Sequence, residues 1–312
     1  MLHHLRLAPG AVALAFVLGP AIPVVVASAL AHEPASARPS SGPAEAAIAD
    51  EAAPTAASDT AGEPFGLPLE GEAAEAFLRT AKVIDRKDIG TGVTRPQRLT
   101  LTDGTRTLRA VWKTIDERKM GLARMEAGGY EFDFRDSWKN EVAAYELSKM
   151  LGLDFVPPTV EREVDGRHGS LQLWVAQALT EKERQKRGLK PDHAARWMQQ
   201  IYCVRLFHQL TYNTDFQNVE NVLVDPAFRV YLIDSSRAFR IQKELLAPDD
   251  LQCFSRRVLE ELAALDGAGL EQHLGRWLDG LQIDGLLARR DLIEALVKVR
   301  LAANGPGQVL FY

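Results

Sequence analysis

The chain has 312 residues, of which 46% are hydrophobic and 25% charged, and its formal net charge is −5. This composition is ordinary for a globular protein and excludes a collagen, a coiled-coil rod, a multi-span membrane protein and a disulfide-stapled miniprotein. The modest acidity also argues against a nucleic-acid partner, because nucleic-acid-binding proteins present a basic face to the phosphates.

The first 31 residues have the pattern of an export signal. Arg6 is the only formal side-chain charge before Glu33, and the apolar stretch ends in Ala29-Leu30-Ala31, a small-x-small pattern that signal peptidase accepts. The apolar run is also long enough to be an uncleaved membrane anchor. Both alternatives place the rest of the chain outside the cytoplasm. We therefore predict an exported protein, periplasmic or secreted, that touches a membrane only if this segment stays uncleaved.

Residues 32–64 are rich in Ala, Pro, Ser, Glu and Gly and have almost no large apolar side chains. Such a segment cannot bury enough surface to offset its ordering entropy, so we predict a disordered linker. Residues 65–312 suffice for one two-lobed domain with a sizeable core. Cys203 and Cys253 are the only cysteines. Export would permit a disulfide between them, and two free thiols are the alternative.

The first part of this domain predicts a small antiparallel sheet. Residues 82–94, 98–102 and 108–113 are strand-like, and Asp103-Gly104 is a hairpin turn signal. A helix is predicted over residues 136–151, which end before Gly152. Another apolar strand is predicted over residues 171–178.

The second part is predicted to be mainly helical. Residues 181–190 are expected to be a charged, solvated stretch, and residues 193–212 have the apolar spacing of a helix. Two short strands, 221–225 and 229–234, are joined by a turn at Asp225-Pro226. Residues 248–301 are again helical, and the apolar chain end is expected to dock on the domain.

Three polar side chains lie at the ends of the predicted hairpin. Asp215 is in the loop after a helix, Asn221 begins the first strand and Asp234 ends the returning strand. A tight hairpin would project Asn221 and Asp234 into one space, with Asp215 at its rim. Hard oxygen donors of this kind suit Mg²⁺, which usually also keeps waters and substrate phosphates as ligands.

This order of residues resembles the protein-kinase-like superfamily, at motif level and over most of residues 82–239. The nearest resemblance is to atypical branches: phosphoinositide-type, HipA-type, secretory-pathway and spore-coat kinases. It implies an α+β, two-lobed fold, with a small antiparallel β N-lobe (about residues 75–178) and a mainly helical C-lobe (about 179–312). It also implies that Asp215 is the catalytic base and that Asn221 and Asp234 bind Mg²⁺.

Residues upstream of the hairpin look like the nucleotide-binding part of the same family. Lys113 would pair with the nucleotide phosphates, with Glu141 as its ion-pair partner, and Gly90 and Gly92 would lie in the phosphate-covering loop. Glu141 is favoured over Glu146 because Glu141 flanks the apolar face of its helix, whereas Glu146 points nearly opposite.

Two features depart from the family pattern. The spacing from Asp215 to Asn221 is six residues, where five is usual. Asn218 is therefore an alternative ligand, although we favour Asn221 because it directly precedes the strand. The usual Gly-containing triplet at the second carboxylate is replaced by Asp234-Ser235-Ser236, as expected only for atypical members.

The sequence thus predicts an exported, atypical kinase-like phosphotransferase that uses ATP and Mg²⁺. Its acceptor, which could be a protein, a lipid or a small molecule, is not identified. Two alternatives stay open: a catalytically inactive kinase-like binding module (a pseudokinase) and an AMP-transferase of the cell envelope.

Overall fold

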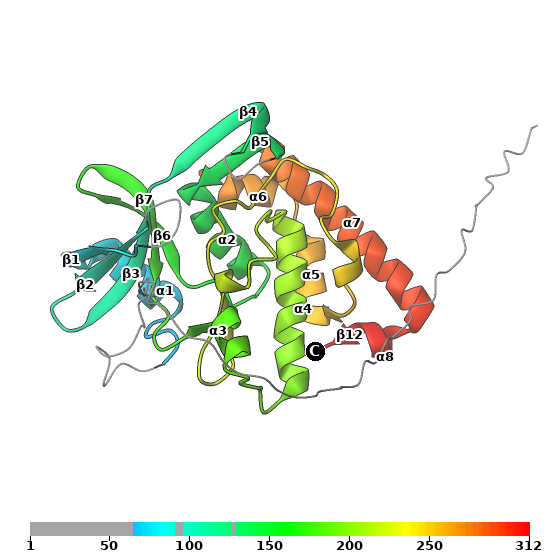
Figure 1. Cartoon of the computed structure of the whole chain (residues 1–312). Coiled ribbons are helices and arrows are strands. Elements are labelled where there is room, and N and C mark those ends of the chain that lie inside the picture. The colour runs from blue at the N-terminus through cyan, green and yellow to red at the C-terminus, as the bar shows by residue number, and fades with distance from the viewer. Residues whose placement is uncertain (1–64, 91–95, 126–128) are drawn as a thin grey trace, which may run out of the picture. The chain divides into compact units, whose positions relative to one another are not determined.

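Five antiparallel strands form the sheet of the N-lobe, on one side of helix α2 in Figure 1. Across the sheet they are β1 (Lys82–Asp88), β2 (Gln97–Thr102), β3 (Thr107–Lys113), β7 (Arg167–Leu173) and β6 (Thr159–Val164). This computed structural model describes residues 65–90, 96–125 and 129–312, which all belong to one unit of the chain, residues 57–312.

The predicted strands on either side of the Asp103-Gly104 turn are confirmed, with β2 and β3 paired in antiparallel register. The strand predicted over residues 171–178 is shifted: β7 begins at Arg167 and ends at Leu173. Strand β6 pairs with β7 along its whole length and is not among the predicted elements.

Helix α1 (Gly71–Thr80), which is also not among the predicted elements, covers one face of the sheet. Its Phe77 packs with Leu99 of β2 and Trp112 of β3 in a buried cluster. Because successive side chains of a strand point to opposite faces, Lys113 points away from this cluster. The core of the N-lobe therefore fixes the direction of the Lys113 side chain.

A hairpin and a helix follow the third strand: β4 (Asp116–Arg124), β5 (Tyr130–Ser137) and α2 (Trp138–Met150). The hairpin is not among the predicted elements. The helix predicted from residue 136 begins two residues later, because Asp136 and Ser137 still pair with β4. Ser137 Oγ then accepts the Lys139 N–H at 3.2 Å and caps the helix.

The C-lobe is mainly helical, with α3 (Glu181–Lys186), α4 (Ala194–Thr211), α5 (Arg256–Ala264), α6 (Gly267–Leu274), α7 (Gly280–Asn304), α8 (Pro306–Val309) and the 3-10 turns η1 (Val219–Asn221) and η2 (Pro248–Asp250). Its strands are short: β8 (Leu179–Thr180), β9 (Val222–Val224), β10 (Val230–Leu232), β11 (Phe254–Ser255) and β12 (Leu310–Phe311).

Several predicted elements of this lobe are confirmed. Helix α4 lies within the predicted range 193–212, and β9 and β10 form the predicted antiparallel hairpin. Asp225 makes its turn, where Oδ1 accepts the N–H groups of Ala227 and Arg229 at 2.9 and 3.0 Å. The apolar chain end docks through β12, which pairs in parallel with β11.

Residues 181–190 are largely exposed, as predicted, and their first part, Glu181–Lys186, forms helix α3. Thr180 caps it by accepting the Glu183 N–H at 3.1 Å. Glu181 is buried and accepts two hydrogen bonds from Arg184, at 2.6 and 2.7 Å. Charged residues three apart share one helix face, so this charge pattern stabilises a short helix.

A buried arginine in α7 links three segments of the C-lobe by hydrogen bonds. Arg289 is fully buried and donates to the carbonyl oxygens of Leu210 at 2.7 Å and Arg240 at 3.0 Å. These bonds join α7 to the end of α4 and to the segment that follows Asp234. Burial lowers the pKa of Arg289 to about 9.

Cys203 and Cys253 are free thiols, so the disulfide that the sequence left open is not formed. The export segment and linker predicted for residues 1–31 and 32–64 lie outside the described residues. Among the helices that the structure describes, none is long and apolar enough to cross a membrane.

Gly169 on β7 leaves no room for a side chain where it faces the end of β3. A Cβ there would lie 2.4 Å from the Lys113 carbonyl oxygen and 2.8 Å from Trp112 Nε1. We predict that Gly169→Ala lowers the free energy of unfolding by about 1–3 kcal/mol, the usual cost of overpacking. Urea unfolding measures the change.

Gly280→Ala is the matched control, because a Cβ at this first residue of α7 meets no atom within 4 Å. Alanine there is expected to be neutral or slightly stabilising. Equal stability of the two variants would contradict the close approach of β7 and β3.

Candidate functional site

Lys113 lies at the centre of a charged cluster that joins the two lobes. Its Nζ is 2.6 Å from Glu141 Oε1 and 2.8 Å from Asp234 Oδ1. Lys113 ends β3, Glu141 is in the first turn of α2 and Asp234 follows β10. The side chains of Lys113 and Glu141 are only 11% and 3% exposed, whereas Asp234 is 42% exposed. Residues from both lobes thus converge on one ammonium group.

The backbone at Asp234 is left-handed, with φ of 59°. This conformation is uncommon for residues other than glycine, although aspartate tolerates it better than most. Neighbouring groups hold it: the Ser235 N–H donates to Glu141 Oε2 at 3.1 Å, and the Ser236 hydroxyl donates to Asp234 Oδ1 at 3.2 Å. Both oxygens of Glu141 are therefore engaged, one by Lys113 and one by the Ser235 backbone.

The segment after Asp234 is fastened to the start of α2. Asn140 Nδ2 donates to the carbonyl oxygens of Ser236 at 2.7 Å and Ala238 at 3.0 Å. The Ser137 N–H also donates to the Ser236 carbonyl at 3.0 Å. Sequence reasoning missed Asn140, because an asparagine within a helix carries no motif.

Strand β5 holds the same segment from another direction. Glu131 pairs with Arg237, and its second carboxylate oxygen accepts from Arg240 at 3.0 Å. The β4–β5 hairpin therefore anchors the segment that follows Asp234.

The charges of the cluster shift one another's pKa values. Burial disfavours the Lys113 ammonium, but Glu141 and Asp234 outweigh it and raise the pKa of Lys113 above its ordinary value. Burial raises the pKa of Glu141 despite the nearby ammonium. Burial opposes ionisation of Asp234 too, but the charge and hydrogen bond of Lys113 hold its pKa below the ordinary value. The Lys113–Asp234 pair is therefore charged at neutral pH.

A further carboxylate, missed by sequence reasoning, lies beside this cluster. Asp136 of β5 interacts electrostatically with Asp234, Lys113 and Arg237. Burial is the main cause that raises its pKa, and Asp234 raises it further, while the nearby Ser236 side chain acts in the opposite direction. The sequence placed this residue in a helix, where it would not point to the site.

Asp215 contacts both of the asparagines considered as ligands. Asn221 Nδ2 donates to Asp215 Oδ2 at 2.7 Å and Asn218 Nδ2 donates to the same oxygen at 3.2 Å. Asn221 also lies across the hairpin from the Asp234 strand, because the Ile233 N–H donates to its carbonyl at 2.9 Å. Both asparagines thus contact Asp215, but it is Asn221 whose backbone bonds to Ile233, the residue before Asp234.

The glycines of the expected phosphate-covering loop are placed only in part. Gly90 follows β1 with φ of 77°, a left-handed conformation that favours glycine. Gly92 lies outside the described residues. The structure therefore places Gly90 but not the loop as a whole.

The oxygen donors of the site fit Mg²⁺ with few protein ligands. Asp234 presents a partly exposed carboxylate, and Asn221 lies across the hairpin, with its backbone carbonyl bonded to the Ile233 N–H and its amide oxygen accepting from Asn218 Nδ2 at 3.4 Å. Within the described ranges, no group of three or more His, Cys, Asp or Glu is arranged to hold a metal. Mg²⁺ is commonly bound by one or two carboxylates together with substrate phosphates, which this donor set allows.

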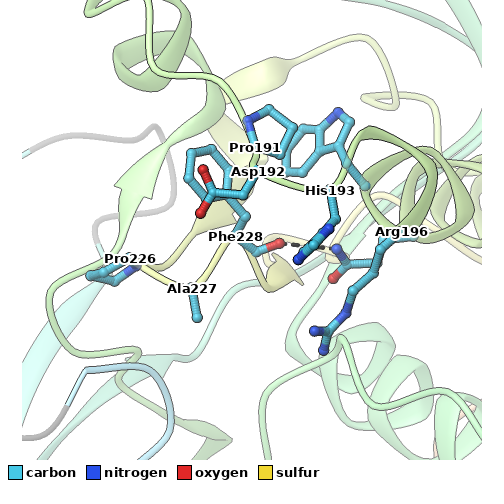
Figure 2. Close-up of a pocket in the computed structure, with 9 residues that line it drawn as sticks. Pro191, Asp192, His193, Arg196, Pro226, Ala227 and Phe228 are labelled. Carbon is cyan, nitrogen blue, oxygen red and sulfur yellow. Dashed lines mark hydrogen bonds between the residues drawn. The ribbon is translucent and has the colours of Figure 1, made fainter.

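Figure 2 shows a hollow elsewhere on the C-lobe, between the start of α4 and the turn of the β9–β10 hairpin. Trp197 and Phe228 line it, with their rings edge to face and 6.2 Å apart. Gln200 Nε2 donates to the Phe228 carbonyl at 2.9 Å. None of the predicted site residues lines this hollow, so it is not the predicted site.

Two solved structures are similar to the whole domain. The structure of hydra Fam20 with sugar is 14% identical, with a TM-score of 0.56, and the match covers 78% of this chain and 93% of that one. The Golgi casein kinase is 14% identical, with a TM-score of 0.55, over 78% of this chain and 79% of that one. The chain therefore has the α+β, two-lobed kinase-like fold that its sequence predicted. No family model and no curated protein matches the sequence.

Lys113→Met would leave Glu141 buried beside the Asp234 carboxylate without its counter-ion. We predict a loss of about 3–5 kcal/mol in the free energy of unfolding, as for other broken buried pairs. Adding Glu141→Gln is expected to recover part of the loss, so that the two changes are not additive. Guanidinium unfolding of the single and double variants measures the coupling.

Lys182→Met is the control, because Lys182 and Glu220 pair at 3.0 Å on the surface, with 65% and 55% of their side chains exposed. Its loss should stay below about 1 kcal/mol. Additive effects of the Lys113 and Glu141 changes would contradict the proposed burial of their pair.

His208 in α4 lies beneath the loop that carries Asp215: its carbonyl accepts the Asn213 N–H at 3.1 Å, and its ring lies 6.4 Å from that of Phe216. Burial lowers the pKa of His208 to about 4. The unfolded chain, with an ordinary histidine pKa near 6.5, takes up this proton first. The stabilisation by His208 is therefore complete above pH 6.5 and is lost as the pH falls toward 4.

We predict that His208→Gln removes a pH dependence of up to about 1.4 kcal/mol per pH unit in this window. Urea unfolding of the wild type and the variant between pH 4.5 and 7.5 isolates the difference, since all other titrating groups are shared. Parallel stability curves for the two proteins would show that His208 is not buried in its neutral form.

Proposed function

We propose that the protein is an atypical kinase-like phosphotransferase that uses ATP and Mg²⁺. The observation that supports it most is the contact of Lys113 with both Glu141 and Asp234, at 2.6 and 2.8 Å. Phosphoryl transfer needs mainly positioning and neutralisation of phosphate charge. A rigidly held ammonium beside a partly exposed carboxylate supplies both kinds of group.

Each residue would have a defined part in the reaction. Lys113 would hold the α- and β-phosphates, and Asp234 and Asn221 would hold Mg²⁺, which when bound neutralises and orients the phosphates. Asp215 would orient the acceptor hydroxyl and accept its proton. The acceptor oxygen would form a bond to the γ-phosphorus as the bond to the β-phosphate oxygen breaks, which releases ADP.

The acceptor class is left open, and export is proposed from the pattern of residues 1–31 alone. An AMP-transferase would use a similar site with the nucleotide reversed, so that the α-phosphate is attacked and pyrophosphate leaves.

One observation favours an inactive binding module instead. Asp215 Oδ2 accepts hydrogen bonds from the amides of both Asn218 and Asn221, at 3.2 and 2.7 Å. Two amide donors already engage this oxygen, so it is not free to accept the proton of an acceptor hydroxyl. A pseudokinase would keep nucleotide binding through Lys113 and Asp234 but would not need a free base.

Nucleotide binding and transfer are tested on the full chain. We predict that ATP with Mg²⁺ raises the melting temperature of the wild type and that Asp234→Asn loses at least most of this increase. Asp249→Asn is the control, because its side chain lies in η2 and is fully exposed. An equal increase in the wild type and Asp234→Asn would remove Asp234 from the site.

Label transfer from γ- or α-labelled ATP then separates the three functions. Transfer of the γ label to protein or water indicates a kinase, transfer of the α label an AMP-transferase, and binding without transfer a pseudokinase. Asp215→Asn is expected to reduce transfer by about 10²–10⁴-fold, the usual contribution of a general base. No stabilisation by any nucleotide would contradict the proposed function altogether.

A further inference from the structure

One carboxylate beside the Lys113 cluster has no part in the proposed reaction. Asp136 Oδ1 is buried and makes no hydrogen bond with any residue that the structure describes. A buried acceptor without a partner is unusual in native proteins and costs free energy, so each case requires a physical explanation.

The basic groups near Asp136 are already paired with other carboxylates. The charged groups that act on it are Asp234, Arg237 and Lys113. Lys113 already contacts Glu141 and Asp234, and Arg237 already pairs with Glu131. The Lys113 ammonium is thus already shared by two carboxylates, and Asp136 has no basic group to itself among the described residues. A divalent cation has the charge that would balance its carboxylate.

Asp136 is better placed to meet a cation than Glu141. Both oxygens of Glu141 already accept hydrogen bonds, from Lys113 and from the Ser235 N–H. Asp136 keeps an oxygen without a partner, and Ser236 links it to Asp234: its hydroxyl donates to Asp234 Oδ1 and interacts with Asp136. Two carboxylates completed by phosphate oxygens and water form an ordinary Mg²⁺ environment.

We propose that Asp136, the second-last residue of β5, is a second carboxylate for the divalent cation at Asp234. The inference rests on the proposed function, because it assigns a further residue to the same cation site. It explains why a buried carboxylate oxygen is kept without a partner: the residue serves the bound cation at a cost to the protein without it.

The test compares the wild-type full chain with Asp136→Asn, using Mn²⁺ and ADP as probes. Calorimetric titration with Mn²⁺ in the presence of ADP is expected to show binding to Asp136→Asn weakened by about tenfold or more. Without metal, the melting temperature of the variant should equal or exceed that of the wild type, because a desolvated charge has been removed. Glu117→Gln is the control, because Glu117 lies opposite Asp136 in the backbone register of β4 and β5 and its side chain is 44% exposed.

The possible outcomes distinguish failure of the role of Asp136 from failure of the proposed function. Unchanged Mn²⁺ affinity in Asp136→Asn would overturn the inference while leaving the proposed function intact. A large drop in metal-free stability would also overturn it, because Asp136 would then be a structural residue held by Ser236. A wild type that binds neither ADP nor Mn²⁺ would mean that the proposed function itself has failed.

Discussion

The buried ammonium of Lys113, shared by two carboxylates, is the interaction on which the rest of the site depends. Glu141 is almost fully buried, and an unpaired charge there would be strongly destabilising. Its counter-ion therefore has to be held at hydrogen-bond distance, as Lys113 is. The sheet and α1 direct Lys113 from one side, and the cap of α2 sets the position of Glu141. Asp234 completes the cluster from the other lobe and makes the pair an inter-lobe contact.

Most of the surrounding structure restrains the segment after Asp234. Asn140 and Ser137 bind its carbonyl groups from α2, Glu131 binds its arginines from β5, and Arg289 binds it from α7. This segment carries a left-handed aspartate, which persists because neighbouring contacts over-determine it. Such rigidity would serve the proposed function, since positioning supplies much of the rate of phosphoryl transfer.

The sequence predicted the elements whose local signals are strong. The β2–β3 and β9–β10 hairpins have clear turn residues. In the structure Lys113 contacts Glu141, whereas Glu146 pairs with Lys149. Helix α1 was missed because its N-cap, Glu70, makes no side-chain cap. Strand β5 was missed although its sequence alternates apolar and charged residues from Tyr130 to Arg135, which is a strand signal.

The position of Asp136 was not predicted, because the sequence pattern assigned Asp136 and Ser137 to a helix, whereas both belong to strand β5. Its proximity to Asp234 arises only when β5 and the segment after β10 meet. Likewise, the likeness to solved structures fixes the fold, whereas the chemistry depends on side chains that only the folded site brings together.

Diffraction from crystals grown with Mn²⁺ and a non-hydrolysable ATP analogue tests the central claim most directly. We predict an anomalous peak within coordination distance of the Asp234 carboxylate, with the Lys113 ammonium on the α- or β-phosphate. Nucleotide bound at the hollow beside Trp197, or a manganese peak remote from Asp234, would contradict it.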